Sequence, residues 1–220
     1  SETPRGERRV KIDYWFDPIC PWCWLTSRWV ATVAAERDLD VTWRPISLFL
    51  KNAPEPDDEF YESTLWSRNL LRVVEAVREA GHEDRIGELY TRFGTHIHHE
   101  DDHDFHVADD LEALGLDPKL AGAQDDDRFD PVIQATMDEG LALTGGNVGT
   151  PLMALDGTDG QRVGLFGPVI SRVPTGDGAV AAWDAFVTLA QTLGFWETKR
   201  DRSEGPQFES VPTEVLAGIS

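Results

Sequence analysis

The spacing of apolar positions changes several times along the chain, and each change predicts a different element. Residues 10–16 (VKIDYWF) form a short apolar and aromatic run bounded by a turn, which predicts a buried strand. Residues 21–37 have the length and apolar density of a helix, and residues 41–48 (VTWRPISL) predict a second strand. Pro45 lacks an N–H group and therefore favours an edge position or a bulge. The order predicts two parallel strands joined by a helical crossover.

The middle of the chain has helical spacing throughout. Its apolar residues recur every three or four positions, and glycines separate several of the segments. The segments are 57–80, 86–95, 107–114, 118–123 and 130–143. This block predicts about four or five helices that follow the second strand.

Strand patterns return after the helical block. Residues 151–155 and 162–166 flank the sequence DGTDG, whose glycines and aspartates predict a hairpin turn. Residues 177–193 carry apolar side chains along one helical face, and the polar segment after about residue 197 predicts an irregular tail. The order β-α-β, helices, β-β-α predicts an α/β protein with the thioredoxin fold and an all-helical insertion between the second and third strands.

This order divides the chain into three parts. We expect residues 10–56 and 144–200 to form a thioredoxin-like domain and residues 57–143 to form an inserted helical domain. Residues 201–220 are expected to form a C-terminal tail. The chain has 220 residues, which is enough for one large domain that carries an insertion.

The two cysteines of the chain, Cys20 and Cys23, lie together where the first helix is predicted to begin. A helix N-terminus stabilises a thiolate, and a second thiol one turn later can resolve a mixed disulfide. Pro21 suits the first helical turn, where a missing N–H group costs nothing. A structural disulfide across two residues would constrain the unfolded chain very little, and a zinc site usually needs four ligands. The sequence therefore favours a redox-active dithiol.

A proline lies in the loop before the third strand, where a thioredoxin-like site needs one. We predict that the Thr150-Pro151 peptide bond is cis, because a cis X-Pro bond builds a tight, exposed turn. The backbone of Thr150 would then be available to hydrogen-bond a substrate beside Cys20. An ordinary trans proline at the start of a strand is the alternative.

Aromatic and acidic residues surround the cysteine pair in the sequence. Trp22 lies between the cysteines and can offer a flat apolar wall to an aromatic acceptor, whereas core filling is the simpler interpretation of Trp15 and Trp29. Asp17 has two interpretations. It is either a buried proton acceptor for Cys23 or, as we favour, the residue that shapes the Asp-Pro turn.

Composition narrows the partners and the compartment. Asp and Glu number 40 against 20 Lys and Arg, which gives a net charge of −20. This charge disfavours nucleic acid and anionic membranes as partners, because both require basic patches. No apolar run reaches the roughly 18 residues that a membrane span needs, and residues 1–9 contain no apolar signal segment. We therefore expect a cytoplasmic protein, in which a lone CxxC pair is more often catalytic than structural.

A histidine-rich segment lies among acidic residues in the helical block. Imidazole and carboxylate groups are metal ligands, but their spacing here matches no defined zinc motif. We favour an exposed polar turn between two helices and expect no bound metal. The histidines are His96, His98, His99, His103 and His106.

Several local signatures together resemble a known family. They are FDPICPWCW at residues 16–24, TSRW at 26–29, GTP at 149–151, FGPV at 166–169, Lys199-Arg200, and PQF at 206–208. This set resembles the DsbA-like thioredoxin superfamily and, within it, the actinobacterial mycothiol-dependent reductases, which include a mycothiol-dependent nitroreductase. The resemblance extends from residue 10 to about residue 208.

The resemblance implies a cytosolic thiol-disulfide oxidoreductase that reduces disulfides or nitro-compounds. Mycothiol, or another low-molecular-weight thiol, would be the reducing co-substrate, with no tightly bound cofactor. The site residues that it implies are the nucleophile Cys20, the resolving thiol Cys23, the cis-proline pair Thr150 and Pro151, and, near the substrate pocket, Asn52 and Tyr61. The histidine-rich segment, the N-terminal extension and the tail after Phe208 depart from the family pattern.

Two other functions stay open. Kappa-class glutathione transferases and 2-hydroxychromene-2-carboxylate isomerases share the inserted thioredoxin fold, but they generally have serine where this chain has Cys20. A non-catalytic metal-binding protein would use Cys20, Cys23 and the histidines. Turnover with mycothiol against glutathione tests the first alternative, and zinc content tests the second.

Overall fold

A mixed four-stranded sheet forms the centre of the protein, in the order β2-β1-β3-β4. The structure is a computed structural model and describes residues 10–216. β1 (Val10–Phe16) pairs with β2 (Leu39–Pro45) in parallel. β3 (Leu152–Asp156) pairs antiparallel with both β1 and β4 (Arg162–Phe166). The predicted parallel pair and the predicted hairpin are both confirmed.

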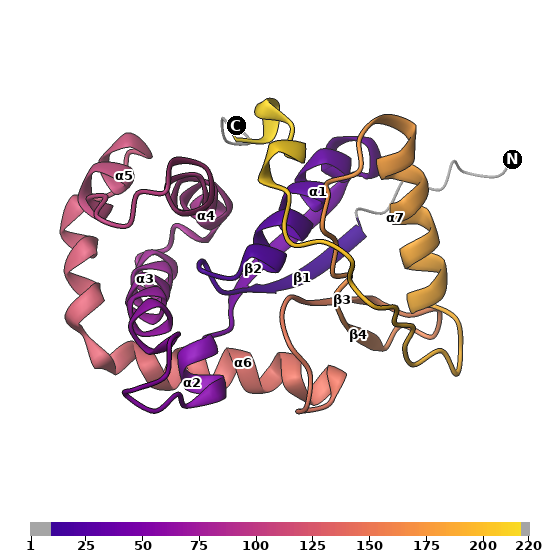
Figure 1. The fold of residues 1–220 in the computed structure, drawn as a ribbon, viewed down its shortest axis with the longest axis horizontal. Coiled ribbons are helices and arrows are strands. Elements are labelled where there is room, and N and C mark those ends of the chain that lie inside the picture. The colour runs from indigo at the N-terminus through magenta and orange to yellow at the C-terminus, as the bar shows by residue number, and fades with distance from the viewer. Residues whose placement is uncertain (1–9, 217–220) are drawn as a thin grey trace, which may run out of the picture.

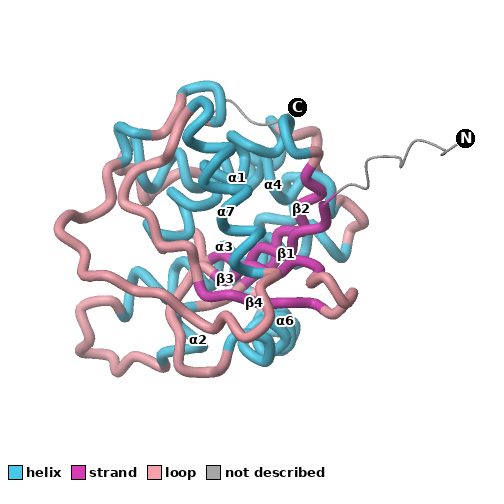
Figure 2. Tube along the Cα trace, turned by 90° about the vertical axis from the view of Figure 1, so that its right-hand side faces the viewer, coloured by secondary structure: helices cyan, strands magenta, loops and turns pink. Residues whose placement is uncertain are grey.

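Helices cover both faces of the sheet. They are α1 (Pro21–Arg37), α2 (Leu48–Asn52), α3 (Tyr61–Glu79), α4 (Ile86–Thr95), α5 (Val107–Ala113), α6 (Asp130–Thr144) and α7 (Gly176–Ala190). Figure 2 shows the strands between α1 and α7 on one side and α6 on the other. Figure 1 shows α3, α4 and α5 grouped together beside this layered core.

The side chains of β1 alternate between the two faces, as the period of a strand requires. Ile12, Tyr14 and Phe16 belong to the large core shared with α1 and α7. Trp15 points the other way, into a smaller core that includes Met137 of α6. Polar and apolar residues alternate at the start of the strand, at Lys11 and Asp13, whereas its last three residues are all apolar because helices cover both faces there.

The second strand ends earlier than the sequence pattern predicts. It stops at Pro45, at the edge of the sheet, where a proline costs no ladder hydrogen bond. Ser47 then begins the short helix α2, because its hydroxyl accepts a hydrogen bond from the Leu50 amide at 3.3 Å. The prediction of strand through residue 48 is therefore wrong, and the apolar residues after Ser47 belong to a helix.

The remaining helices follow the predicted segments with small changes. α3 begins at Tyr61 rather than residue 57, residues 118–125 form 3-10 turns, and α7 ends at Ala190 rather than residue 193. All helices of the predicted insertion lie between β2 and β3 in chain order, which confirms the predicted sequence of elements. The domain boundaries themselves stay predictions.

The tail is irregular, as predicted, but it packs back onto the core. Val211 and Val215 are buried, and the Val215 carbonyl accepts a hydrogen bond from Nη1 of Arg28 at 2.9 Å. Figure 1 shows this yellow segment crossing in front of the sheet before it reaches α1. The N-terminal extension expected at residues 1–9 and the last four residues of the tail lie outside the described residues. Within residues 10–216, no helix combines the length and the apolar character needed to cross a membrane.

Candidate active site

The CxxC pair lies at the N-terminus of α1, where the sequence places it. Cys20 is the N-cap residue, with extended backbone angles, and its Sγ accepts a hydrogen bond from the Cys23 amide at 3.3 Å. Pro21 occupies the first helical turn. Both cysteines are reduced, with Cys20 only 4% exposed and Cys23 fully buried. The pair is therefore a dithiol with one sulfur at the helix start, where its thiolate is stabilised.

The two thiols have opposite acidities. Burial alone would raise the pKa of Cys20, but hydrogen bonds from the Cys23 thiol, the Thr150 hydroxyl and the Cys23 amide outweigh it and lower this pKa below its ordinary value. Burial, together with the neighbouring Cys20, raises the pKa of Cys23 well above its ordinary value. Cys20 is thus the sulfur that ionises first, and Cys23 stays protonated beside it.

The cis peptide bond predicted at Thr150-Pro151 is confirmed. In the same loop, the Thr150 hydroxyl donates to Sγ of Cys20 at 3.2 Å. A second cis bond, at Gly167-Pro168, was not predicted. The two loops are connected, because the Gly167 amide donates to the Pro151 carbonyl at 2.8 Å.

Side chains on both sides of the dithiol fix the helix start in place. The buried Tyr14 hydroxyl donates to the Cys23 carbonyl at 2.7 Å. The hydroxyl of Thr26, one turn further along α1, donates to the Pro168 carbonyl at 2.8 Å. Neither role was predicted. Tyr14 shares the alternating pattern of β1, but a strand pattern does not reveal which helix carbonyl a tyrosine will reach.

Asp17 is fully buried directly before the motif, and its contacts agree with the turn-forming interpretation that we favoured. Its backbone carbonyl accepts from the Cys20 amide at 3.0 Å, as a turn-forming residue requires. Its carboxylate accepts from the Ile19 amide at 3.1 Å, from the Leu48 amide at 2.7 Å and from the Ser67 hydroxyl. Burial raises the pKa of Asp17 to about 6, although these hydrogen bonds oppose the rise. Through these hydrogen bonds, the Asp17 carboxylate connects the turn before the motif to the start of α2 and to α3.

The tryptophans near the motif differ in their surroundings. Trp15 and Trp29 are each 2% exposed and fill the core, as predicted. Trp22 is half-buried, and the guanidinium of Arg202 lies over its ring at 4.7 Å from the centroid. The fully buried Trp24 carries Arg28 on its ring at 4.2 Å. One face of the aromatic wall expected at Trp22 is therefore in contact with a cation from the tail.

The histidine-rich segment is only partly the exposed turn that was predicted. Residues His96–Glu100 form one π-helical turn that continues α4, and the burial of Ile97 draws this turn inward. Nε1–H of Trp24 donates to Nε2 of His99 at 2.9 Å, and the ring of His98 stacks on Trp24 at 5.7 Å. These two half-buried imidazoles therefore pack against α1 through Trp24.

The charge state of these histidines follows from their burial. Burial lowers the pKa of His98 to about 4, so this neutral imidazole donates from Nε2 to the Pro18 carbonyl at 2.9 Å. Burial also lowers the pKa of His99. His103 and His106 are exposed, as expected. Within residues 10–216, no group of three or more His, Cys, Asp or Glu side chains is arranged to hold a metal ion.

The two residues expected near a substrate pocket lie at the end of α2 and at the start of α3. Asn52 is exposed at the end of α2. Tyr61 is half-buried at the start of α3 and packs edge-on against Phe49 at 5.5 Å. In the part of the chain that the structure describes, neither side chain makes a hydrogen bond or ring contact with the cysteines. Their place in substrate binding stays a prediction.

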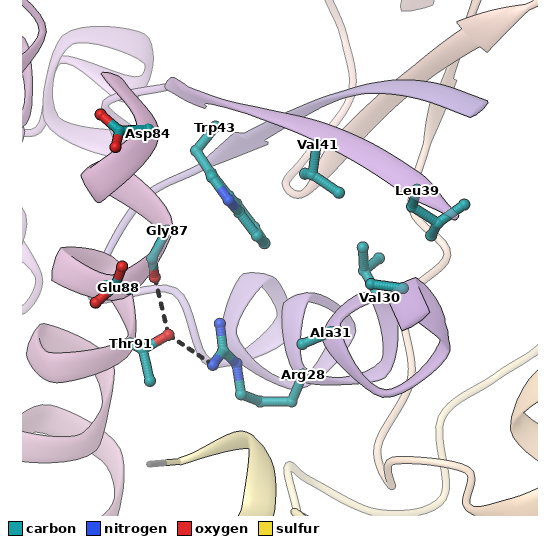
Figure 3. A pocket seen from close by; sticks show the side chains of 11 residues that line it. Arg28, Val30, Ala31, Leu39, Val41, Trp43, Asp84, Gly87, Glu88 and Thr91 are labelled. Carbon is teal, nitrogen blue, oxygen red and sulfur yellow. Dashed lines mark hydrogen bonds between the residues drawn. The ribbon is translucent and has the colours of Figure 1, made fainter. Parts of the chain in front are cut away.

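A cavity of about 200 Å³ lies between α1, β2 and α4. Figure 3 shows Arg28 and Trp43 pointing into it, with apolar residues of α1 and β2 along one wall. Nη1 of Arg28 donates to the Thr91 hydroxyl at 2.8 Å. Neither the cysteines nor the cis-proline loop line this cavity, so it is separate from the dithiol.

Solved structures with similar folds are thiol oxidoreductases of the DsbA type. The cytosolic disulfide reductase DsbM from Pseudomonas aeruginosa is 20% identical, with a TM-score of 0.53 over 81% of this chain and 99% of that one. The probable DsbA oxidoreductase SCO1869 from Streptomyces coelicolor is 16% identical, also with a TM-score of 0.53, over 93% of this chain and 99% of that one. These likenesses confirm the predicted thioredoxin fold with inserted helices.

Sequence comparison gives the family. "Uncharacterized protein Rv2286c" from Mycobacterium tuberculosis is 28% identical over 198 residues, which cover 87% of this chain and 82% of that protein. The model of the Rv2466c-like family, described as mycothiol-dependent nitroreductase Rv2466c, matches residues 19–200. That range includes both cysteines and the cis-proline loop. The chain is accordingly a thiol-dependent oxidoreductase, and it belongs to the Rv2466c-like family of mycothiol-dependent nitroreductases.

Proposed function

We propose that this thiol-disulfide oxidoreductase is a cytoplasmic, mycothiol-dependent reductase of disulfides or nitro-compounds. The observation that carries the proposal is the hydrogen bonding of the Cys20 sulfur. Within a chain of the mycothiol-dependent family, this sulfur accepts from the Cys23 amide and the Thr150 hydroxyl at 3.3 and 3.2 Å. Both donors favour the thiolate, which is the attacking form in disulfide exchange.

The first half-reaction oxidises the dithiol. The Cys20 thiolate attacks one sulfur of the acceptor disulfide, a mixed disulfide forms, and the other sulfur leaves as a thiolate. Cys23 then gives its proton to that thiolate, attacks Sγ of Cys20 and releases the second thiol of the acceptor. Cys23 keeps its proton until this point because burial raises its pKa. Two electrons move from the dithiol to the acceptor.

A nitro-compound accepts the same two electrons in a different form. With two protons it becomes a nitroso-compound and water, while the dithiol becomes the Cys20–Cys23 disulfide. Trp22, half-buried between the cysteines, offers an aromatic surface next to the reacting sulfur. In this proposal Thr150 also offers its backbone groups to the bound acceptor.

Mycothiol restores the dithiol in the second half-reaction. One mycothiol thiolate attacks the Cys20–Cys23 disulfide and forms a mixed disulfide with Cys20. A second mycothiol attacks that bond, which releases mycothiol disulfide and the reduced protein. The family match supports mycothiol as this co-substrate. Serine at the first motif position, which marks the glutathione transferase alternative, is replaced here by Cys20.

Steady-state turnover tests the proposal. Wild-type protein is supplied with either mycothiol or glutathione, each with its own disulfide reductase and NADPH, and with a disulfide or a nitro-aromatic acceptor. We expect turnover with mycothiol to exceed turnover with glutathione, and Cys20→Ser to abolish it. Equal rates with both thiols would contradict the choice of mycothiol. Undiminished turnover by Cys20→Ser would contradict dithiol chemistry altogether.

A further inference from the structure

The C-terminal segment places a cation at the rim of the dithiol. The Arg202 guanidinium lies over the indole of Trp22, with its central carbon 4.7 Å from the ring centroid. Trp22 stands between the two cysteines in the motif and is half-buried, whereas Arg202 itself is exposed. The positive charge therefore lies against the residue that separates Cys20 from Cys23 in the motif.

Arg202 differs from most described arginines because it forms no ion pair with a carboxylate of residues 10–216. In residues 10–216, all arginines except Arg28, Arg200 and Arg202 form an ion pair with Asp or Glu. Arg28 is buried, and its Nη1 bonds to Thr91 and Val215. The net charge of −20 repels anions from the protein as a whole. An exposed guanidinium beside Trp22 that has no ion-pair partner among residues 10–216 can instead attract an anionic group locally.

The segment that carries Arg202 is anchored close by. Glu204 pairs with Arg172 at 2.8 Å, and the Gln207 amide donates to the Ser171 carbonyl at 2.9 Å. The ring of Phe208 packs on His98 at 5.2 Å, next to α1. These contacts lie two to six residues after Arg202 and fix the path of the yellow segment in Figure 1. Holding Arg202 beside Trp22 therefore costs less conformational entropy than it would on a free tail.

We propose that Arg202, held against Trp22, is a subsite for a negatively charged group on the acceptor disulfide. This subsite rests on the proposed disulfide-reductase function. It adds a substrate class to that function, namely disulfides with a carboxylate near the sulfur that Cys20 attacks. A contact with the indole face uses the charge of the guanidinium and leaves its N–H groups available, and these groups pair well with a carboxylate.

The subsite leaves the exchange reaction itself unchanged. Cys20 still forms the mixed disulfide, the acceptor thiolate still leaves, and Cys23 still supplies the proton and the second sulfur. Arg202 acts on the binding and orientation of the acceptor before the attack. Its contribution should therefore depend on the charge of the acceptor and should weaken as salt screens that charge.

Three aliphatic disulfides that differ mainly in charge provide the test. They are dithiodipropionate with two carboxylates, hydroxyethyl disulfide with no charge, and cystamine with two ammonium groups. Pre-reduced protein is mixed with each, and the second-order rate of dithiol oxidation is followed by acid quench and thiol alkylation, which requires no mycothiol. We expect Arg202→Gln to slow dithiodipropionate about tenfold, since charge-assisted pairing is lost. Hydroxyethyl disulfide should change less than twofold, and cystamine should become faster.

Two further variants separate local from general effects. Arg202→Lys keeps the charge and should retain most of the rate with dithiodipropionate. Arg128→Gln removes an equal charge from an exposed arginine paired with Glu79 at the end of α3, and should leave all three rates unchanged. Equal slowing of all three disulfides by Arg202→Gln, or no slowing of dithiodipropionate, would overturn the subsite. If none of the three disulfides oxidises the reduced wild-type protein, the proposed disulfide-exchange function is contradicted, and not only the subsite.

Discussion

The hydrogen bond from Thr150 to Cys20 makes a testable contribution to the acidity of the nucleophile. The hydroxyl oxygen lies 3.2 Å from Sγ, and the two residues are 6% and 4% exposed, so water screens this interaction very little. Thr150→Val removes the hydroxyl and keeps the branched shape of the side chain. The other two donors to the sulfur, the amide and the thiol of Cys23, remain in place.

The magnitude follows from the charge on the acceptor. A hydrogen bond to an ionised group contributes roughly 1.5–3 kcal/mol, and about 1.4 kcal/mol corresponds to a tenfold change in an ionisation equilibrium. Loss of the hydroxyl therefore raises the pKa of Cys20 and leaves about tenfold less thiolate near neutral pH. Because a more basic thiolate is also a better nucleophile, the fall in reaction rate at neutral pH should be smaller, about threefold.

Alkylation of Cys20 by iodoacetamide, measured across pH, gives both quantities. The midpoint of the rate profile should move to higher pH in Thr150→Val, and Thr150→Ser should restore it. Thr26→Val is the matched control, because its hydroxyl donates to the Pro168 carbonyl and not to sulfur. An unchanged midpoint in Thr150→Val would refute the reasoning that this hydroxyl stabilises the thiolate.

Three further predictions concern the surroundings of the dithiol. Cys23→Ser should trap a mixed disulfide between Cys20 and the acceptor, seen as an adduct by intact mass, because no thiol remains to resolve it; its absence would contradict the assigned roles. Gly94→Ala should lower the free energy of unfolding, measured by urea titration, by about 1–3 kcal/mol, because a Cβ at this position would lie 2.1 Å from the buried Trp24 ring. An unchanged urea midpoint would show that the ring can move aside. Folding raises the pKa of Asp17 to about 6, above the roughly 3.9 of an unfolded chain. The folded state therefore binds this proton more tightly, and the free energy of unfolding falls as the pH rises from about 4 to about 6. Asp17→Asn should remove up to about 3 kcal/mol of that pH dependence, and an identical slope in both proteins would contradict it.

The parts of the fold that local sequence determines were predicted well. The apolar run of β1, the CxxC pair with Pro21 at a helix start, and the glycine-rich turn before β4 each depend on neighbouring residues. The cis bond at Thr150-Pro151 also followed from the order of the strands. In the first three cases the residue types restrict the backbone directly, whereas the cis bond was inferred because the strand order places this proline at the position that such a site needs.

The errors come from contacts between distant residues. The histidine-rich segment has the composition of an exposed turn, but Trp24 and His99 meet across 75 positions of sequence. Likewise, Leu48 leaves the predicted strand because its amide reaches the Asp17 carboxylate, although Ser47 was a readable helix cap. Propensity and spacing do not encode such pairings, because tertiary packing decides them.

This difference separates the chemistry of the site from its selectivity. The groups that set the reactivity of Cys20 lie within the motif or in the cis-proline loop, and both have signatures that a sequence shows. The residues that surround the entrance, such as Arg202 and Phe208, come from a polar tail whose composition predicts only an irregular segment. Their position depends on anchors such as the ion pair between Glu204 and Arg172. Disulfide exchange can therefore be inferred from the sequence, whereas the choice of acceptor depends on how the tail packs against the motif.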